Sequence, residues 1–174
     1  MFDDPRFTLS QVADAAGVSA NTLRSWLQRK HWRLDMAIGD SPAEIAGKAH
    51  LVTLRRALHI GAAAELIRND VDPARAFKAA RSFVDVYDPI FEGDGHFRGP
   101  DGLFETGWTM LVAYPDQEHG VIVRIENDPM AKDQTSLLSL LFPKLYGTKR
   151  SGTFVWLNQV DKQIRTALTR LEAA

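Results

Sequence analysis

Apolar residues near the amino end of the chain recur at spacings of three and four, the period of an amphipathic α-helix. The first such group, Val12, Ala13 and Ala16, predicts a short helix that Ser10 would cap. Gly17 follows at once, where a chain leaving a helix often adopts a positive φ. The pattern therefore predicts a helix that ends in a tight turn.

A second helix is expected from residue 20 to about residue 30, with Ser19 as its cap. Its inward face would carry Leu23, Trp26 and Leu27, again three and four residues apart. Two helices joined by a short turn that contains glycine are typical of the helix-turn-helix motif.

After this motif, apolar residues alternate with polar or small ones from position 32 to position 38, which predicts a short extended segment. Residues 39–42, with Gly39 and Pro42 at their ends, are typical of a turn. A winged helix-turn-helix places its wing here, and His31 and Arg33 would then contact the DNA backbone or the minor groove. Residues 42–46 are also compatible with a helical turn.

Two longer helices are expected next. The first runs from about residue 48 to Asn69, and the second starts at Pro73, capped by Asp72, and continues to about residue 86. The first helix has an apolar stripe with basic and acidic residues outside it: Leu51, Leu54, Leu58, Ala62 and Leu66 inside, and Arg55, Arg56, Glu65 and Arg68 outside. His50 and His59 in this region are expected to be structural or exposed and not ligands.

The last third of the chain changes to a strand pattern. Residues 108–114 and 121–126 predict a β-hairpin, and residues 154–157 predict a third strand. A final helix is expected over residues 159–172, capped by Asn158, with an apolar stripe formed by Val160, Ile164, Ala167, Leu168 and Leu171. The predicted fold class is α+β, with a helical, winged helix-turn-helix domain before a small unit of about three strands and one or two helices. The corresponding domains are residues 1–87, a connector at 88–107, and residues 108–174.

Composition narrows the classes of function. The chain has 174 residues, a net charge of −1 and 45% hydrophobic residues, which is ordinary for a globular protein of one or two domains. Cysteine is absent, which excludes disulfides, thiolate metal ligands and thiol catalysis. No apolar run approaches the roughly 20 residues of a membrane helix, and the acidic start does not resemble a signal peptide, so we expect a cytoplasmic protein without a membrane partner.

The outer face of the second helix carries the candidate chemistry. No acidic residue lies between Asp14 and Asp35. Arginine can read guanine with two hydrogen bonds, and asparagine or glutamine can read adenine. Polar and cationic residues on or just after this helix are therefore candidates for contacts with double-stranded DNA: Ser19, Asn21, Thr22, Arg24, Ser25, Arg29, Lys30, His31 and Arg33. An ordinary helical hairpin with a solvated polar face is the alternative.

This stretch resembles the DNA-binding end of MerR-type winged helix-turn-helix regulators over residues 9–30. The matching residues are Val12, Ala13, Gly17, Val18, Ser19, Thr22, Leu23, Arg24 and Trp26. The resemblance implies a DNA-binding first half, dimerisation, and a signal-receiving region after it. The absence of cysteine rules out the metal sensing that some members perform through thiolates. The residues 47–50 depart from the arginine and tyrosine that usually close the family's wing.

The glycine-rich connector contains Asp94, His96 and Asp101, which could ligate a metal by type. Their spacing matches no metal motif, and the phosphate-loop ending is missing, so a connecting loop is the preferred interpretation. No catalytic set is visible, and we expect neither an enzyme nor a cofactor.

The leading hypothesis is a sequence-specific transcription regulator that binds DNA as a homodimer. The C-terminal unit or the stripe of the last helix would form the dimer surface, or the stripe would pack within the chain. A small-molecule effector could bind among Trp108, Tyr114, Phe154 and Trp156, although packing in a core is the simpler explanation of these aromatic residues. Two alternatives remain open: an excisionase-like accessory factor that bends DNA, and a module that binds a protein partner and contacts DNA secondarily.

Overall fold

The computed structural model describes residues 3–43, 48–84, 98, 102–125 and 151–172 of the chain. In chain order the elements are β1 (Phe7–Thr8), α1 (Leu9–Ala15), α2 (Ala20–Gln28), the 3-10 helix η1 (Met36–Ile38), β2 (Leu51–Val52), α3 (Leu54–Arg68), α4 (Pro73–Val84), β3 (Trp108–Ala113), β4 (Val121–Ile125), β5 (Thr153–Trp156) and α6 (Leu157–Glu172). Helices combined with small antiparallel sheets confirm the predicted α+β class. No helix in this described part is both long and apolar enough to cross a bilayer.

The first two helices form where the apolar pattern predicts them. Gly17 has a φ of 65°, and the Ser19 hydroxyl accepts a hydrogen bond from the Thr22 N–H at 2.9 Å. The predicted cap of α1 is wrong, because Thr8 takes that place. The Thr8 hydroxyl accepts from the Gln11 N–H, while the Gln11 side chain accepts from the Thr8 N–H at 2.8 Å, which is a capping box.

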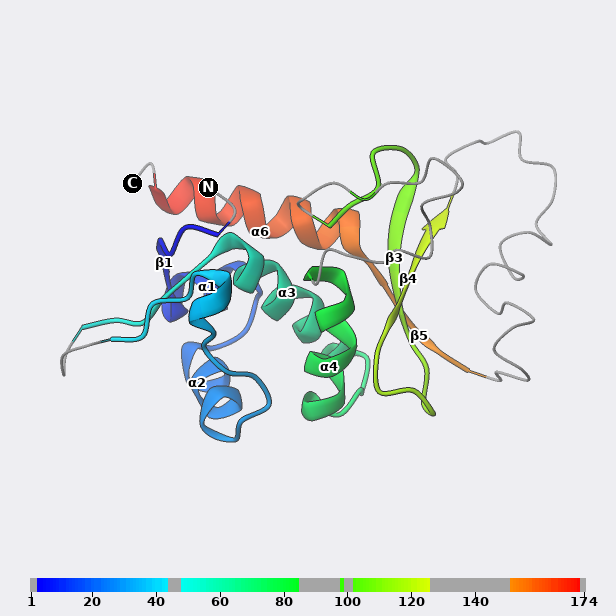
Figure 1. The fold of residues 1–174 in the computed structure, drawn as a ribbon, viewed down its shortest axis with the longest axis horizontal. Coiled ribbons are helices and arrows are strands. Elements are labelled where there is room, and N and C mark those ends of the chain that lie inside the picture. Colours follow the sequence, from blue (N-terminus) through cyan, green and yellow to red (C-terminus); the bar gives the residue numbers. More distant parts are fainter. Residues whose placement is uncertain (1–2, 44–47, 85–97, 99–101, 126–150, 173–174) are drawn as a thin grey trace.

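The segment after α2 differs from the prediction. Residues 36–38 form the 3-10 helix η1 and not an extended strand, because the Asp35 carboxylate accepts the Ala37 N–H and starts a helical turn. Strand-type pairing begins only at Ser41, whose N–H and C=O pair with those of Leu51 at 2.8 and 2.9 Å. The described residues next to this pair, 42–43 and 48–50, project from the body of the protein (Figure 1). We call residues 41–43 and 48–51 the arm.

The strand β2 at the end of the arm shortens the next helix. β2 pairs antiparallel with β1, placing Phe7 opposite Val52, so the chain is extended where the helical stripe was predicted to begin. α3 starts only at Leu54, capped by the Thr53 hydroxyl. α4 starts at Pro73 as predicted, and the Asp72 carboxylate accepts the Arg75 N–H at 3.2 Å.

The predicted hairpin and third strand form one antiparallel sheet in the order β4-β3-β5. Its central strand places Leu111 between Ile122 and Val155, and Leu111 is completely buried against the helices. The helix α6 starts at Leu157, immediately after β5, so the prediction that Asn158 caps it is wrong. The Asn158 amide oxygen instead accepts the Thr109 N–H at 2.7 Å and ties α6 to β3.

The last helix lies along α1 and α3 (Figure 1). Most of its apolar stripe is buried there, with Ile164 1% and Leu168 2% exposed, whereas Leu171 is 40% exposed, so the stripe packs mainly within the chain. Gly61 allows the close approach, because a Cβ at this position would lie 3.0 Å from the Ile164 side chain. The largest buried cluster combines residues from both predicted domains.

Several predicted features lie outside the described residues. These include the candidate ligands Asp94, His96 and Asp101 in the connector, and the whole segment 126–150 between β4 and β5.

Candidate nucleic-acid interface

The helix α2 divides sharply into two faces. Leu23 is completely buried and Trp26 is 8% exposed, which fixes the helix to the core. The opposite face carries exposed polar and cationic side chains: Asn21, Arg24, Gln28 and, just past the helix end, Arg29 and Lys30. Because one face is fully used for packing, the other is presented to solvent in a fixed orientation.

Side chains from distant elements hold the turn between α1 and α2. Arg68 at the end of α3 donates to the carbonyl of Ala16 and, at 3.1 Å, to that of Gly17. Gln163 of α6 donates to the Ala15 carbonyl at 2.9 Å. These donors satisfy carbonyls that the end of α1 leaves free, so α3 and α6 together set the angle between the two helices.

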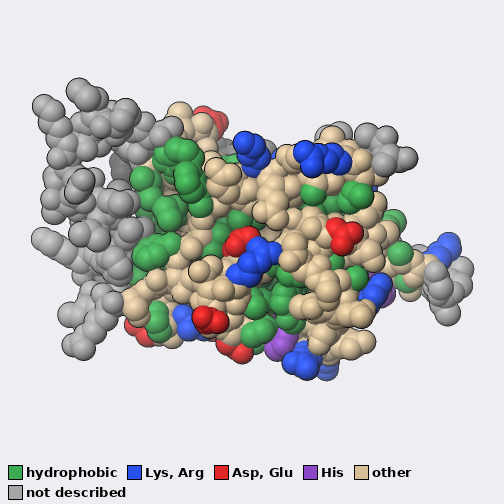
Figure 2. Space-filling model, turned by 180° about the vertical axis from the view of Figure 1, so that it is seen from behind, with side chains coloured by type: hydrophobic (Ala, Val, Ile, Leu, Met, Phe, Trp, Pro, Cys, Tyr) green, Lys and Arg blue, Asp and Glu red, His purple; other side chains and the backbone are tan. Residues whose placement is uncertain are grey.

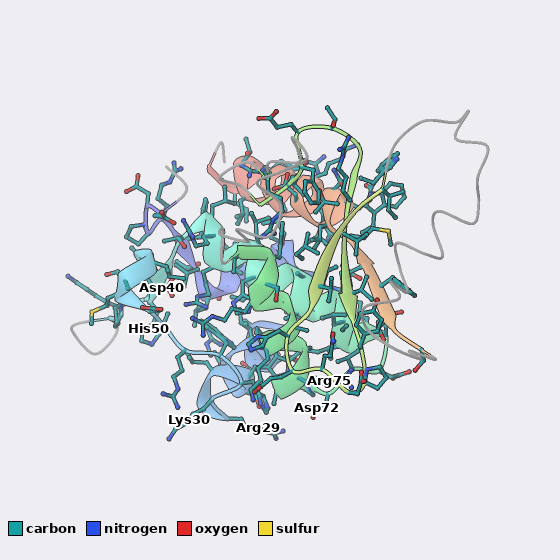
Figure 3. The ribbon with its side chains drawn as sticks, turned by 45° about the vertical axis from the view of Figure 1, so that its right-hand side comes forward. Arg29, Lys30, Asp40, His50, Asp72 and Arg75 are labelled. Atoms are coloured by element: carbon teal, nitrogen blue, oxygen red, sulfur yellow. The ribbon has the colours of Figure 1, made fainter. Side chains whose placement is uncertain are left out.

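The cations of this region have few partners. Arg24 donates to the Asn21 side chain at 3.2 Å, which leaves most donors of its guanidinium available. Within the described part of the chain, Arg29, Lys30 and Arg33 form no ion pair with an acid. Figure 3 shows Arg29 and Lys30 directed away from the body at its lower edge, and Figure 2 shows basic side chains at this edge and on the arm. The result is a local cationic surface on a protein of nearly neutral net charge.

The structure brings together most of the predicted contact residues. The hydroxyls of Ser19 and Thr22 lie 2.8 Å apart at the start of α2, and Ser25 is half-buried one turn later. His31 and Arg33 follow the helix directly and do not lie on the arm, which corrects their placement on a wing. His31 is half-buried, whereas Arg33 is exposed.

Lys30 ends α2 in an unusual conformation. Its φ is 61°, in the left-handed region that glycine adopts without strain. The Lys30 N–H donates to the Leu27 carbonyl, and the His31 N–H donates to the Trp26 carbonyl at 3.0 Å. These two bonds close the helix in a Schellman motif. A lysine at this position is strained, and such strain often accompanies functional sites.

The arm adds a second group of polar residues beside α2, at the lower left of both Figure 1 and Figure 3. Lys48 is exposed, and the ring Nδ1 of His50 accepts the Ala43 N–H at 2.9 Å across the arm. The sequence predicted a wing after the second helix, with a turn at residues 39–42, but it placed residues from 48 onward in a long helix. It therefore missed the contribution of Lys48 and His50 to the arm.

A buried polar network lies under the arm. The Asp40 side chain, which is 0% exposed, accepts a hydrogen bond from Arg56 Nε at 2.8 Å. Arg56 Nη1 lies 3.1 Å from His59 Nδ1, and His59 Nε2 lies 2.8 Å from the Phe77 carbonyl. An arginine can only donate and a carbonyl can only accept, so His59 is neutral with its proton on Nε2.

Two further features describe this network. Burial lowers the pKa of His59 from 6.5 to about 4; the bond to the Phe77 carbonyl opposes the shift, and the charges of Arg56 and Arg81 add to it. The prediction that Arg56 lies outside is wrong, because Asp40 and the Trp32 ring, 5.5 Å from the guanidinium, give it a buried partner and a packing surface. The i, i+3 spacing of Arg56 and His59 was visible in the sequence, but the distant partner was not.

The predicted aromatic group is divided between core and surface. Tyr114 is completely buried, and Trp108 packs edge-on against Trp156 with ring centroids 4.2 Å apart. Phe154 and Trp156 also line an open hollow of about 230 Å³. Polar side chains from α3, its end and α6 also line the hollow: Glu65, Asn69, Gln159 and Gln163.

Within the described residues, no group of three or more histidine, aspartate or glutamate side chains is placed to hold a metal ion. No protein-family model, curated protein or solved structure matches this chain. The resemblance to MerR-type regulators therefore stays an expectation that rests on residues 9–30.

Proposed function

We propose that this protein is a sequence-specific DNA-binding transcription regulator that places the outer face of α2 in the major groove. The observation that carries the proposal is the contrast between the two faces of α2. The buried face fixes the helix, while the outer face presents cations that have no acidic partner in the described part of the chain. Donors held in a fixed orientation on a helix are what base reading requires.

In this proposal the predicted residues divide into two roles. Asn21, Arg24, Ser25 and Arg29 face the bases and nearby phosphates, and Ser19, Thr22, Lys30, His31 and Arg33 mainly set the position of the helix on the DNA. Contacts to phosphate fix the register, whereas contacts to base edges specify the sequence. The arm would lie along the adjacent backbone, as the wing of a winged helix-turn-helix does, with Lys48 as its cation.

One α2 helix makes too few contacts for tight and specific binding. Proteins of this kind usually dimerise and read two half-sites about one helical turn, or a multiple of it, apart. We therefore propose a homodimer, acting in the cytoplasm. Because Ile164 and Leu168 of the α6 stripe are buried within the chain, we place the dimer surface mainly on other residues.

Recovery of bound fragments from sheared genomic DNA at near-physiological salt, followed by sequencing, tests the proposal. An inverted repeat with a fixed spacing between half-sites is the expected result. Recovery of fragments that share no sequence motif, and that are lost as the salt concentration rises, would contradict the proposal, since purely electrostatic binding behaves in this way.

A further inference from the structure

The direction of the arm depends on a short, irregular stretch of chain. Between the end of α2 and the start of the arm, the described secondary structure is the three-residue helix η1. The chain bends at Gly39, which has a φ of 87° and no room for a side chain, because a Cβ would lie 2.1 Å from the Asp3 carbonyl oxygen. The next residue, Asp40, directly precedes the arm, so whatever holds Asp40 sets where the arm points.

Asp40 is held by two directional bonds to one of its carboxylate oxygens. One of its carboxylate oxygens accepts Arg56 Nε at 2.8 Å and the Asp35 N–H at 2.9 Å. Arg56 belongs to α3 and its side chain is 7% exposed. The carboxylate therefore fastens the base of the arm to the long central helix, where the charged pair is shielded from water.

The same network also reaches α2. His59 accepts from Arg56 and donates to the backbone of Phe77, whose ring meets the edge of the Trp26 ring at a centroid distance of 5.5 Å. The Trp32 ring stacks on Phe77 from the segment that follows α2, at 6.4 Å. Phe77 of α4 thus contacts α2 directly and is linked to the base of the arm through His59, Arg56 and Asp40.

Stability alone does not explain a buried ion pair at this place. A buried pair is often no more stabilising than well-packed apolar residues of similar size, because both charges lose their hydration. What the pair adds is direction, since each of its hydrogen bonds accepts only a narrow range of geometry.

We propose that Asp40, Arg56 and His59 are positioning residues for DNA recognition, which hold the arm at the distance from α2 that lets both elements contact one DNA duplex. This inference rests on the proposed function. None of the three residues would touch DNA, and their effect would be confined to contacts that the arm makes.

The test compares variants on a short duplex taken from the recovered genomic fragments. The main variant combines Asp40→Leu with Arg56→Met, which replaces both charges by apolar side chains and should keep the fold. Lys48→Ala removes the exposed cation of the arm, and Arg24→Ala removes a cation of α2. Each is measured alone and in the double-variant background, with circular dichroism and thermal unfolding as checks of the fold.

We expect Lys48→Ala to lower the slope of log affinity against log salt by about 1, as for one lost phosphate contact. The double variant should show the same reduction, and adding Lys48→Ala to it should have no further effect. Arg24→Ala should keep its full effect in that background. A general loss of structure would instead weaken both kinds of contact.

If the double variant does not fold, a pair at His59 replaces it. His59→Leu removes both bonds and should lower the salt slope, whereas His59→Gln can still accept and donate and should restore it. An unchanged slope in the folded variants, or a Lys48→Ala substitution without effect in the wild-type protein, would overturn the inference alone. A wild-type protein without any sequence preference would overturn the proposed function as well.

Discussion

The buried network below the arm and the outer face of α2 use charged side chains in opposite ways. Asp40 and Arg56 lie in the interior and pair with each other, with 0% and 7% of their side chains exposed. Arg29 and Lys30 are exposed and have no acidic partner in the described part of the chain. The first group can contribute to folding and position, and the second contributes little to folding, so it is available for a ligand. Substitutions in the two groups should therefore change different measured quantities.

Asp40→Ala should have the largest effect, and that effect should be on folding. It leaves the Arg56 charge buried without a partner, which typically costs about 3 to 5 kcal/mol of the free energy of unfolding. Urea denaturation followed by circular dichroism measures this cost. Asp14→Ala is the matched control, because Asp14 is exposed on α1 and its removal should change stability by no more than about 0.5 kcal/mol. Equal losses of stability for Asp40→Ala and Asp14→Ala would show that the buried network contributes no more to folding than an exposed carboxylate does.

Acid should weaken the network through His59. Its pKa is about 4 in the folded protein and 6.5 in an unstructured chain, so the unfolded protein binds the extra proton first as the pH falls. The stabilisation is complete above pH 6.5 and is lost progressively toward pH 4, by up to about 3 kcal/mol at about 1.4 kcal/mol per pH unit. The free energy of unfolding, measured by denaturation across this window, should fall more steeply with decreasing pH for the wild-type protein than for His59→Gln. The same pH dependence in both proteins would contradict the assignment of this effect to His59.

Lys30→Gly should have a smaller effect and should separate folding from binding. Glycine relieves the strain of a φ of 61°, so we expect stability to rise by up to about 1 kcal/mol while affinity for DNA and its salt dependence fall. Asp70, which ends α3 with a φ of 62°, offers the matched control. Asp70→Gly should also stabilise the fold but leave DNA binding unchanged. A Lys30→Gly variant that binds DNA as well as the wild-type protein would remove Lys30 from the interface.

Local signals in the sequence predicted the first two helices and the turn between them well. The Ser19 cap, the positive φ of Gly17 and the buried Leu23 and Trp26 depend on neighbours within a few residues, and all are confirmed. The hairpin of β3 and β4 is confirmed for the same reason, since strand alternation and a short turn define it.

Features that depend on distant partners were not predictable from one sequence. The burial of Arg56 follows from Asp40, which lies 16 residues earlier in the chain. The role of Asn158 follows from Thr109, 49 residues away. The helical pattern at residues 48–53 was overruled by the pairing of β2 with β1, so the second strand of the arm was predicted as helix, although a wing was expected after α2.

The most direct test of α2 as the DNA-reading element is the affinity of Arg24→Ala for every single-base variant of the recovered site. Arg170→Ala on α6 serves as the control, because Arg170 is exposed and carries the same charge on another element. If Arg24 reads a guanine, its removal should cost about 1 to 3 kcal/mol and abolish the preference at one base pair, while Arg170→Ala changes neither. Wild-type affinity and an unchanged base preference for Arg24→Ala would contradict the assignment of α2 as the reading helix.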